Sequence, residues 1–309
     1  MKSIFVYNPE SGKGKLKKYK DYIVQNLSNR YGEIDVVETQ KTGHAREIAE
    51  QSIGKYDYFF IAGGDGTLNE VINGFAGRED SPIIGYIPCG TVNDVARSLG
   101  IERNIKKCIN QLTNGEAESF DTFKINDRYG FYVCCAGLFT QSSYSTARKT
   151  KKHLGKIAYF FQGAKDFFSS KSIKLKWKDD NGNDVVKKCS LLLIINSRSV
   201  AGFKINKKAN LHDGKVDIII FESKKDKVKL SEMIQCMNLF IRGLDKTKTK
   251  KYVTYKQLDQ FSIQLEDEAT INIDGENAGK TNININVIKD GIKIIIPKRT
   301  KDGNKNKSK

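Results

Sequence analysis

The sequence predicts an α/β protein of two domains, the first with a largely parallel sheet and the second a mainly antiparallel β-sandwich. The first third of the chain alternates four times between a short apolar strand and an amphipathic helix, whereas beyond about residue 125 short strands follow one another through turns such as DDNGND. The first pattern favours a parallel sheet covered by helices, and the second favours antiparallel sheets. With 309 residues, the chain is long enough for two separate cores.

Each strand expected in the first domain leads through a loop into a helix. After the first strand, Leu16, Tyr19, Ile23 and Leu27 recur at helical spacing, and Leu68, Val71, Ile72 and Phe75 do so after the third. The strands are expected at residues 3–7, 34–39, 56–62 and 82–87. In the second half, helices are expected around 157–168 and 229–241. We therefore predict domains at 1–125 and 126–289, with a basic, disordered tail at 298–309.

The charge balance suggests an anionic partner. Lys and Arg number 53 against 36 Asp and Glu, which gives a net charge of +17. Such a chain favours nucleic acid, anionic membranes or phosphorylated small molecules, although a solvated lysine-rich surface explains the charge equally well. No nucleic-acid-binding motif is present, so we expect no nucleic acid partner. The cluster Arg148–Lys156, followed by the aromatic residues YFF, is a candidate membrane-docking patch, with a solvated helix face as the alternative.

Other sequence features point to a cytoplasmic protein. The longest purely apolar run, Leu191–Ile195, is far too short to cross a bilayer, and the N-terminus does not resemble a signal peptide. The six cysteines form no CxxC pair and the chain has three histidines, so we expect reduced thiols and no zinc site.

Three strand-to-helix junctions have compositions suited to phosphate binding. They are Asn8–Gly12, Gly63–Thr67 and Gly90–Asp94. Ligands bind at the carboxyl ends of strands in such sheets, where helix N-termini direct N–H groups at anions. The first junction has no Walker A spacing and reads equally well as a turn and cap. In the second, the glycines allow close backbone approach, although Asp65 could simply form an Asx-turn.

The second and third junctions each contain a hydroxyl and a carboxylate. If their strands are neighbours, Asp65 and Asp94 lie side by side near the phosphates. Paired carboxylates beside phosphates suggest a shared Mg²⁺, because phosphoryl transfer requires the charge of a triphosphate to be offset.

These segments together resemble the diacylglycerol kinase family, most closely its soluble bacterial lipid kinases. The segments that carry the resemblance are NPESG, GGDGTLNEVINGF, IPCGTVNDVAR, AGLFTQSSY, LGKIAYF, NLHDGKVD and INIDGE, in that order. GGDGT alone is shared with NAD kinases, but its combination with GTVND and a late DGE is specific. The resemblance covers residues 2 to about 297.

The resemblance implies a fold and an activity. The fold is a three-layer α/β nucleotide domain of the NAD-kinase/phosphofructokinase type and a C-terminal β-sandwich that holds the lipid, with a strand at about 290–297 returning to the first domain. The activity is transfer of phosphate from ATP to the primary hydroxyl of diacylglycerol, giving phosphatidic acid for phospholipid metabolism. The alternatives are a kinase for another lipid alcohol (sphingoid or polyprenol) or an NAD kinase-like enzyme. A non-enzymatic binding module is disfavoured by the intact set of acids.

The resemblance also implies site residues. ATP contacts are expected at Asn8, Pro9, Glu10, Ser11, Gly12, Thr39, Gly64, Asp65, Gly66, Thr67, Leu68, Asn69, Glu70 and Thr91. A network of Mg²⁺, water and aspartates is expected at Asp65, Asp94 and Asp121. Asp274 or Glu276 of the DGE triplet would be the general base, although D-G by itself more often marks a hairpin turn.

A second, structural metal site is implied in NLHDGKVD. Its ligands would be the Asp213 carboxylate and the carbonyls of Asn210 and Lys215, and an ordinary β-turn is an equally good reading. The expected location is the cytoplasm, peripherally associated with the inner face of the membrane. The sequence leaves open whether the chain forms a homodimer.

Overall fold

The computed structural model describes residues 1–9, 11, 15–138, 171–265, 269–279 and 282–298. Three predictions lie outside these ranges: the helix at 157–168, the cluster Arg148–Lys156, and the tail beyond residue 298. Two of the expected ATP contacts, Glu10 and Gly12, also lie outside them.

The described chain divides into two compact units. The first comprises Met1–Ser119 with Ile292–Lys309, and the second comprises Phe120–Gly291, each taken over its described residues only, which end at residue 298 and leave out 139–170. Two strands, β5 (Glu116–Ile125) and β15 (Ile283–Ile296), contribute residues to both units. The two units divide within β5, between Ser119 and Phe120, whereas the domain boundary was expected at about residue 125.

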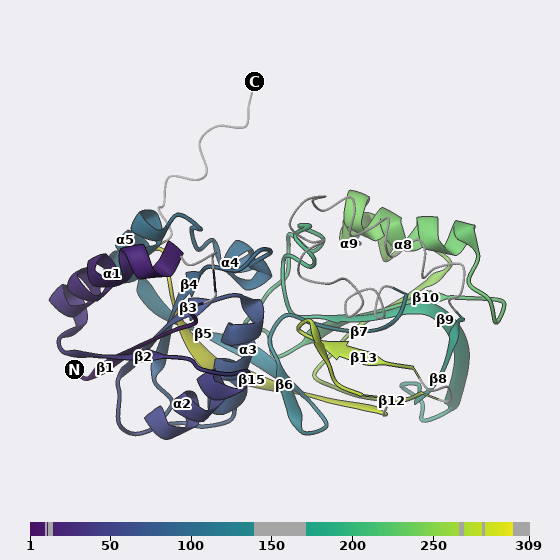
Figure 1. The fold of residues 1–309 in the computed structure, drawn as a ribbon. Helices are drawn as coiled ribbons and strands as arrows, with labels where there is room; N and C mark the ends of the chain where they lie inside the picture. The colour runs from purple at the N-terminus through teal and green to yellow at the C-terminus, as the bar shows by residue number, and fades with distance from the viewer. Residues whose placement is uncertain (10, 12–14, 139–170, 266–268, 280–281, 299–309) are drawn as a thin grey trace. The chain divides into compact units, whose positions relative to one another are not determined.

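The first unit is a parallel sheet with helices on both faces. Its central strands pair in the order β4, β3, β1, β2, and β15 adds to β4 in parallel where Ile294 lies opposite Ile84. Helices α1 and α5 cover one face and α2 and α3 the other (Figure 1). The elements are β1 (Ser3–Tyr7), α1 (Lys15–Tyr31), β2 (Ile34–Glu38), α2 (His44–Ser52), β3 (Tyr58–Gly63), α3 (Asp65–Phe75), β4 (Ile83–Pro88), α4 (Asp94–Leu99) and α5 (Ile105–Asn114).

The core of this unit forms where the predicted apolar patterns meet. Strands β1 and β3 are buried almost throughout, as expected for strands covered on both faces. Leu16, Ile23 and Leu27 of α1 are fully or nearly fully buried, and the Tyr31 hydroxyl donates to the carbonyl of Leu112 in α5 at 2.5 Å. The predicted strand–helix alternation is thus confirmed.

The second unit consists mainly of antiparallel strands. Strand β9 pairs with β7, β8 and β10, and all three pairings are antiparallel. The elements are β6 (Arg128–Gly130), β7 (Val133–Gly137), β8 (Ile173–Lys178), β9 (Asp184–Ile195), β10 (Val216–Glu222), α8 (Leu230–Arg242), α9 (Leu244–Thr247), β11 (Val253–Leu258), β12 (Gln260–Leu265), β13 (Ile271–Ile273) and β14 (Glu276–Asn277).

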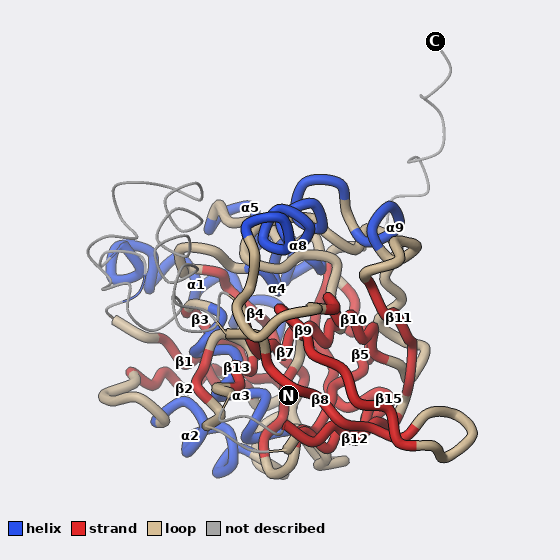
Figure 2. The backbone as a smooth tube through the Cα atoms, turned by 90° about the vertical axis from the view of Figure 1, so that its right-hand side faces the viewer, coloured by secondary structure: helices blue, strands red, loops and turns tan. Residues whose placement is uncertain are grey.

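The core of the second unit is formed by alternating strand residues. Phe123, Leu175, Trp177, Ile194 and Ile218 belong to one buried cluster. Figure 2 shows the strands β8, β12 and β15 running side by side, with α8 and α9 beyond the ends of β9 and β10. The helix expected at 229–241 is confirmed as α8. Within the described ranges, no helix combines the length and apolar character needed to cross a bilayer.

Candidate active site

The junctions predicted to bind phosphate follow adjacent strands at one edge of the first unit's sheet. The Asn8 amide donates to the carbonyl of Ala62 at 3.1 Å, so the loop after β1 begins beside the end of β3. The Thr39 amide donates to Tyr7 at 3.0 Å, which places the end of β2 beside β1. Ser11 closes a turn on Asn8 through its amide, at 3.0 Å. Parallel pairing thus brings the expected nucleotide contacts Asn8, Thr39, Gly64 and Thr91 to the same edge.

The two glycine-rich loops after β3 and β4 touch backbone to backbone. A Cβ on Gly90 would lie 2.7 Å from the Cα of Gly64 and 2.6 Å from Oδ1 of Asn93. The loops are also joined by the Cys89 amide, which donates to the carbonyl of Gly63 at 2.8 Å. Glycine at position 90 is therefore required by packing, because a side chain there has no space.

Asp65 directs its carboxylate at the loop after β4. Its Oδ2 accepts from the amide of Asp94 at 3.1 Å and its Oδ1 from the amide of Val95 at 3.3 Å. These amides belong to the first turn of α4, where a carboxylate satisfies N–H groups that have no partner within the helix. Asp65 is thus an acceptor for the backbone of the neighbouring helix.

The environment of Asp65 shifts its titration. The pKa of this carboxyl is raised to about 6, because burial and, to a smaller extent, the charge of Asp94 raise it more than the backbone hydrogen bonds lower it. Asp94 is itself 3% exposed. The structure therefore brings together the two acids predicted to lie side by side.

Helix α3 presents its first turn without a side-chain cap. Its N-cap residue is Gly64, and the amide of Leu68 returns to the carbonyl of Gly64 at 3.1 Å. Further along α3, Glu70 accepts from the amide of Ala45 in the first turn of α2, at 3.2 Å. Two acids predicted to contact ATP thus hold the backbones of neighbouring helices, while the first-turn amides of α3 carry the partial positive charge that favours an anion.

Two residues that hold the loop after β4 were not among the predicted site residues, although Asn93 lies within the predicted third junction. Arg103 donates through one guanidinium nitrogen to the carbonyls of Gly90 and Thr91, both at 3.2 Å. Asn93 adopts a left-handed backbone conformation (φ 53°), and its side-chain nitrogen Nδ2 donates to the carbonyl of Gly90 at 2.9 Å. Asparagine tolerates this conformation better than most residues, which was the available signal for Asn93. No comparable signal marked Arg103, because it lies outside the predicted junction, beyond the end of α4.

In the second unit the two acids of the DGE triplet lie in different environments. The Asp274 carboxylate is 3% exposed and accepts from the amides of Phe131 at 2.6 Å, Tyr132 at 3.0 Å and Val133 at 2.9 Å. Asp274 also has a left-handed backbone (φ 51°), as does Gly275 (φ 93°), as the D-G turn predicted. Glu276 is exposed at the start of β14. Asp274 therefore anchors the chain, and Glu276 has the accessible carboxylate.

Asp121 is fully buried and holds two segments of the second unit. Its Oδ2 accepts from the amide of Gly214 at 2.6 Å, and its Oδ1 from the amide of Asp290 at 3.0 Å. Its own amide donates to the carbonyl of Leu211 at 2.9 Å. Asp121 thus fixes the loop that contains the predicted structural metal ligands.

A buried asparagine links these two acids. The Asn196 side chain donates to the carbonyl of Asp121 at 2.8 Å and to that of Phe131 at 3.2 Å, and its amide donates to Tyr132 at 3.0 Å. The segment that binds the Asp274 carboxylate is therefore tied to the start of the second unit. No sequence motif marked Asn196, which lies at the end of an apolar strand.

The predicted metal ligands differ in how well they suit a cation. Within the described ranges, no three side chains of His, Cys, Asp or Glu gather to hold a metal. Both carboxylate oxygens of Asp65 and of Asp121 already accept backbone N–H groups, so these acids suit a cation through water better than by direct contact. Asp213 is exposed and uses Oδ1 to accept from the Lys215 amide at 3.1 Å. Its Oδ2, with nearby carbonyls, suits a hard cation.

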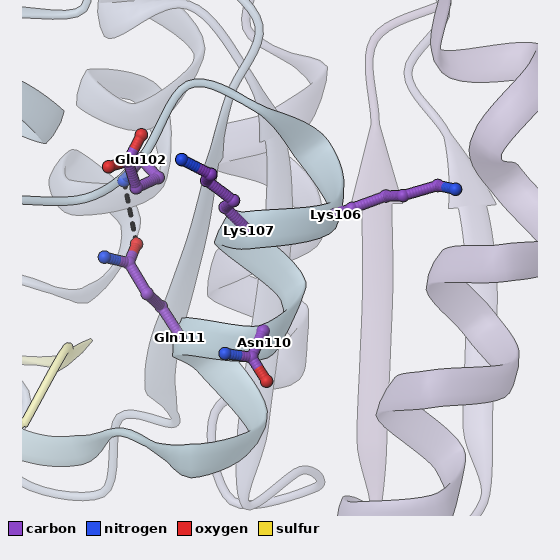
Figure 3. A pocket seen from close by; sticks show the side chains of 5 residues that line it. All are labelled: Glu102, Lys106, Lys107, Asn110 and Gln111. Carbon is purple, nitrogen blue, oxygen red and sulfur yellow. Dashed lines mark hydrogen bonds between the residues drawn. The ribbon is translucent and has the colours of Figure 1, made fainter.

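The pocket drawn in Figure 3 does not belong to this site. It is lined by Glu102 and by side chains of α5, among them Lys106, Lys107 and Gln111. Gln111 accepts there from the amide of Glu102 at 2.8 Å. None of the predicted site residues lines it.

The fold and loops define a two-unit protein in which a parallel α/β sheet with glycine-rich loops is joined to an antiparallel unit. The family model described as the diacylglycerol kinase catalytic domain matches residues 2–125. A diacylglycerol kinase of Staphylococcus saprophyticus is 35% identical over 300 residues, covering 96% of both chains. One of Staphylococcus epidermidis is 35% identical over 295 residues, covering 95% of this chain and 91% of its own. The chain therefore belongs to the diacylglycerol kinase family, a family of enzymes.

A solved structure agrees with the fold. The crystal structure of a diacylglycerol kinase from Bacillus anthracis matches with a TM-score of 0.78 and 23% identity, covering 96% of each chain. The predicted family and the predicted combination of an α/β unit with a strand-rich unit are thus confirmed. The roles of the individual site residues stay predictions.

Proposed function

We propose that this protein transfers the γ-phosphoryl group of ATP to the primary hydroxyl of diacylglycerol, forming phosphatidic acid and ADP. The observation that carries the proposal is the contact of Gly64 with Gly90, supported by Asp65, in a chain that shares 35% identity with a diacylglycerol kinase over 300 residues. Two touching glycine-rich loops, one of which leads into the N-terminus of α3, suit a polyphosphate, and the family suits the lipid acceptor.

The proposed nucleotide site lies at the carboxyl ends of the strands in the first unit's sheet. The first-turn amides of α3 and the hydroxyl of Thr67 would bind phosphate oxygens, and Asn8 and Thr39 would lie beside the remainder of the nucleotide. Asp65 contributes indirectly, since its carboxylate fixes the amides of Asp94 and Val95. It acts as a positioning residue, and its charge is absorbed by that backbone.

Glu276 is proposed as the general base. As the lipid hydroxyl oxygen attacks the γ-phosphorus, its proton passes to the Glu276 carboxylate, and the bond from phosphorus to the β–γ bridging oxygen breaks with its electron pair leaving on ADP. The choice of Glu276 over Asp274 rests on exposure. The Asp274 carboxylate is committed to three backbone amides, whereas Glu276 is accessible at the start of β14.

Mg²⁺ is proposed as the ion that accompanies ATP and, separately, as the ion of the loop around Asp213. When bound, the first offsets the charge of the triphosphate. Asp65, Asp94 and Asp121 would act through water or the backbone. At the second site, Asp213 with the carbonyls of Asn210 and Lys215 would hold the ion and stiffen the loop that Asp121 already fixes.

The proposed setting is phospholipid metabolism at the inner face of the membrane. Diacylglycerol resides in the bilayer, and no described helix is long and apolar enough to cross it. We propose that the protein acts in the cytoplasm, peripherally associated with the membrane, and the charge of +17 supports an anionic surface as its partner.

The test is an acceptor panel with γ-labelled ATP and Mg²⁺, offering diacylglycerol, a sphingoid base, a polyprenol and NAD to the full chain. We expect label in phosphatidic acid, and a loss of about 10²–10⁴-fold in the rate for Glu276→Gln. Label in NAD or in another lipid alcohol, with none in phosphatidic acid, would overturn the proposed acceptor. Transfer by Glu276→Gln at the parent rate would remove the base from the mechanism.

A further inference from the structure

Helix α8 turns its most apolar side outward. Leu230, Ile234 and Ile241 are 54%, 51% and 73% exposed, and they follow one another along a single face. Met233 and Met237 are partly exposed next to them. Among the seven large apolar side chains exposed in the described ranges, three are on this one helix. We call Leu230, Ile234 and Ile241 the α8 stripe.

The inward side of α8 does not explain this arrangement. It buries Glu232, Cys236 and Leu239. Glu232 accepts from the Ser223 hydroxyl at 3.1 Å with both oxygens, and the Cys236 sulfur lies 3.6 Å from the Ser190 hydroxyl. The helix thus buries the Glu232 carboxylate beside Cys236 and Leu239 and leaves two isoleucines exposed, whereas an ordinary surface helix keeps its charged side chains outside. Figures 1 and 2 both show α8 on the outer side of β9 and β10.

Basic residues lie at both ends of the stripe. Between residues 224 and 251 the chain has nine Lys or Arg and three Asp or Glu. Lys224, Lys225 and Lys227 precede α8 and are exposed. They lie at the positive end of the helix dipole, where cations destabilise a helix, so the stability of α8 does not account for them.

We propose that the α8 stripe docks on an anionic phospholipid bilayer, with the apolar side chains entering the interface and the flanking lysines binding lipid headgroups. This inference rests on the proposed function, which requires a lipid that resides in the bilayer. An amphipathic helix with an apolar face and basic borders is the form that lies in a membrane surface. A second copy of the chain fits less well, because two-fold symmetry would place the basic ends of the two helices against each other.

The direct test is binding of the full chain to vesicles, without ATP, of phosphatidylcholine alone or mixed with an anionic phospholipid. We expect binding to the anionic vesicles, weakened by salt. The triple variant Leu230→Ser, Ile234→Ser, Ile241→Ser should bind about 100-fold more weakly, because three exposed apolar side chains no longer enter the interface. The matched control is Val36→Ser with Val186→Ser, two exposed valines on strands, which should bind as the parent does.

A second measurement does not depend on losing a side chain. Ile241→Trp adds a tryptophan to the stripe, while the native Trp177 is 5% exposed. We expect a blue shift of fluorescence when anionic vesicles are added, and no such shift for Val186→Trp. Replacing Lys224, Lys225 and Lys227 with Gln should weaken anionic binding by about fivefold per lysine, whereas Lys106→Gln with Lys107→Gln on α5 should not.

The outcomes separate this inference from the proposed function. Phosphorylation of diacylglycerol dispersed in detergent should be equal in the parent and in the triple variant. If the parent phosphorylates dispersed diacylglycerol but ignores vesicles, or if the triple variant binds them as the parent does, the inference is overturned and the proposed function stands. If the parent binds vesicles through the stripe but phosphorylates no lipid, the docking stands and the proposed function falls. Concentration-dependent pairing that buries Ile241→Trp without lipid would instead identify a second copy as the partner, and would overturn the proposal.

Discussion

Gly64 and Gly90 approach so closely that a Cβ on Gly90 would lie 2.7 Å from the Cα of Gly64. A Cβ essentially never makes a non-bonded contact shorter than 3.0 Å, so the two loops can touch only while Gly90 lacks a side chain. The relationship is unequal, because a Cβ on Gly64 would lie 3.4 Å from the Cα of Gly90, an ordinary van der Waals distance. Gly64 also has φ −88°, which any residue can adopt.

This inequality predicts different outcomes for two alanine substitutions. Gly90→Ala should force the loops apart, lower the free energy of unfolding by about 1–3 kcal/mol and weaken ATP binding. Gly64→Ala should leave the free energy of unfolding close to that of the parent. Urea denaturation and nucleotide titration of both variants measure these effects, and equal destabilisation by the two would contradict the packing argument.

Much of the first unit could be predicted from the sequence because its signals are local. The spacing of Leu16, Ile23 and Leu27 identified a helix face, and these residues are buried. The glycine loops could be placed at strand ends for the same reason, and parallel pairing then brought them together.

The roles of the acids could not be predicted, because they depend on contacts between residues far apart in the chain. Asp65 accepts from amides 29 and 30 residues away, and Asp274 accepts from amides more than 140 residues away. No pattern along the chain distinguishes a carboxylate that binds a backbone from one that awaits a substrate. For that reason Asp274 and Glu276 were equivalent candidates in the sequence and differ in the structure.

The contrast between these two acids gives the second prediction. Asp274→Ala should lower the free energy of unfolding by at least about 3 kcal/mol, because three buried amides lose their acceptor. Glu276→Gln should change it by less than about 0.5 kcal/mol, because the side chain is exposed, and should lose turnover. Thermal unfolding and single-turnover transfer assays on the same preparations separate stability from chemistry. A stable Asp274→Ala without turnover would reverse the assignment of anchor and base.

The third prediction concerns the pH dependence of activity. The pKa of Asp65 is about 6, so its carboxylate becomes protonated as the pH falls through that value. The protonated group has an O–H where the amide of Asp94 or Val95 needs an acceptor, so the loop after β4 should loosen. We expect kcat/KM to fall below about pH 6 in the parent. In Asp65→Asn this limb should vanish and activity should be low throughout, whereas Asp80→Asn, which alters an exposed acid, should keep the parent profile.

The fourth prediction concerns the pH dependence of stability. As the pH rises, the contribution of Asp65 to the free energy of unfolding should decrease, whereas kcat/KM should increase. Because the folded protein holds this proton more tightly than the unfolded chain does, the contribution of Asp65 to the free energy of unfolding is largest at low pH and decreases as the pH rises from 3.8 to about 6. The free energy of unfolding of the parent, taken relative to that of Asp65→Asn in urea, should therefore decline across this window. A difference that is independent of pH would show that the carboxyl titrates normally.

The loop around Asp213 gives the last prediction. If this loop binds Mg²⁺ in the folded protein only, added Mg²⁺ should raise the midpoint temperature of thermal unfolding. At a Mg²⁺ concentration of a hundred times Kd, the free energy of unfolding should increase by about 2.7 kcal/mol. Asp213→Ala removes the exposed carboxylate oxygen and should abolish this response without lowering stability in a chelator, because the fold of the loop is held by Asp121 through Gly214. Asp127→Ala, which removes another exposed acid from a turn of the same unit, should respond to Mg²⁺ as the parent does. An undiminished response in Asp213→Ala would place the ion elsewhere, and an absent response in the parent would leave this loop as a turn fixed by Asp121 alone.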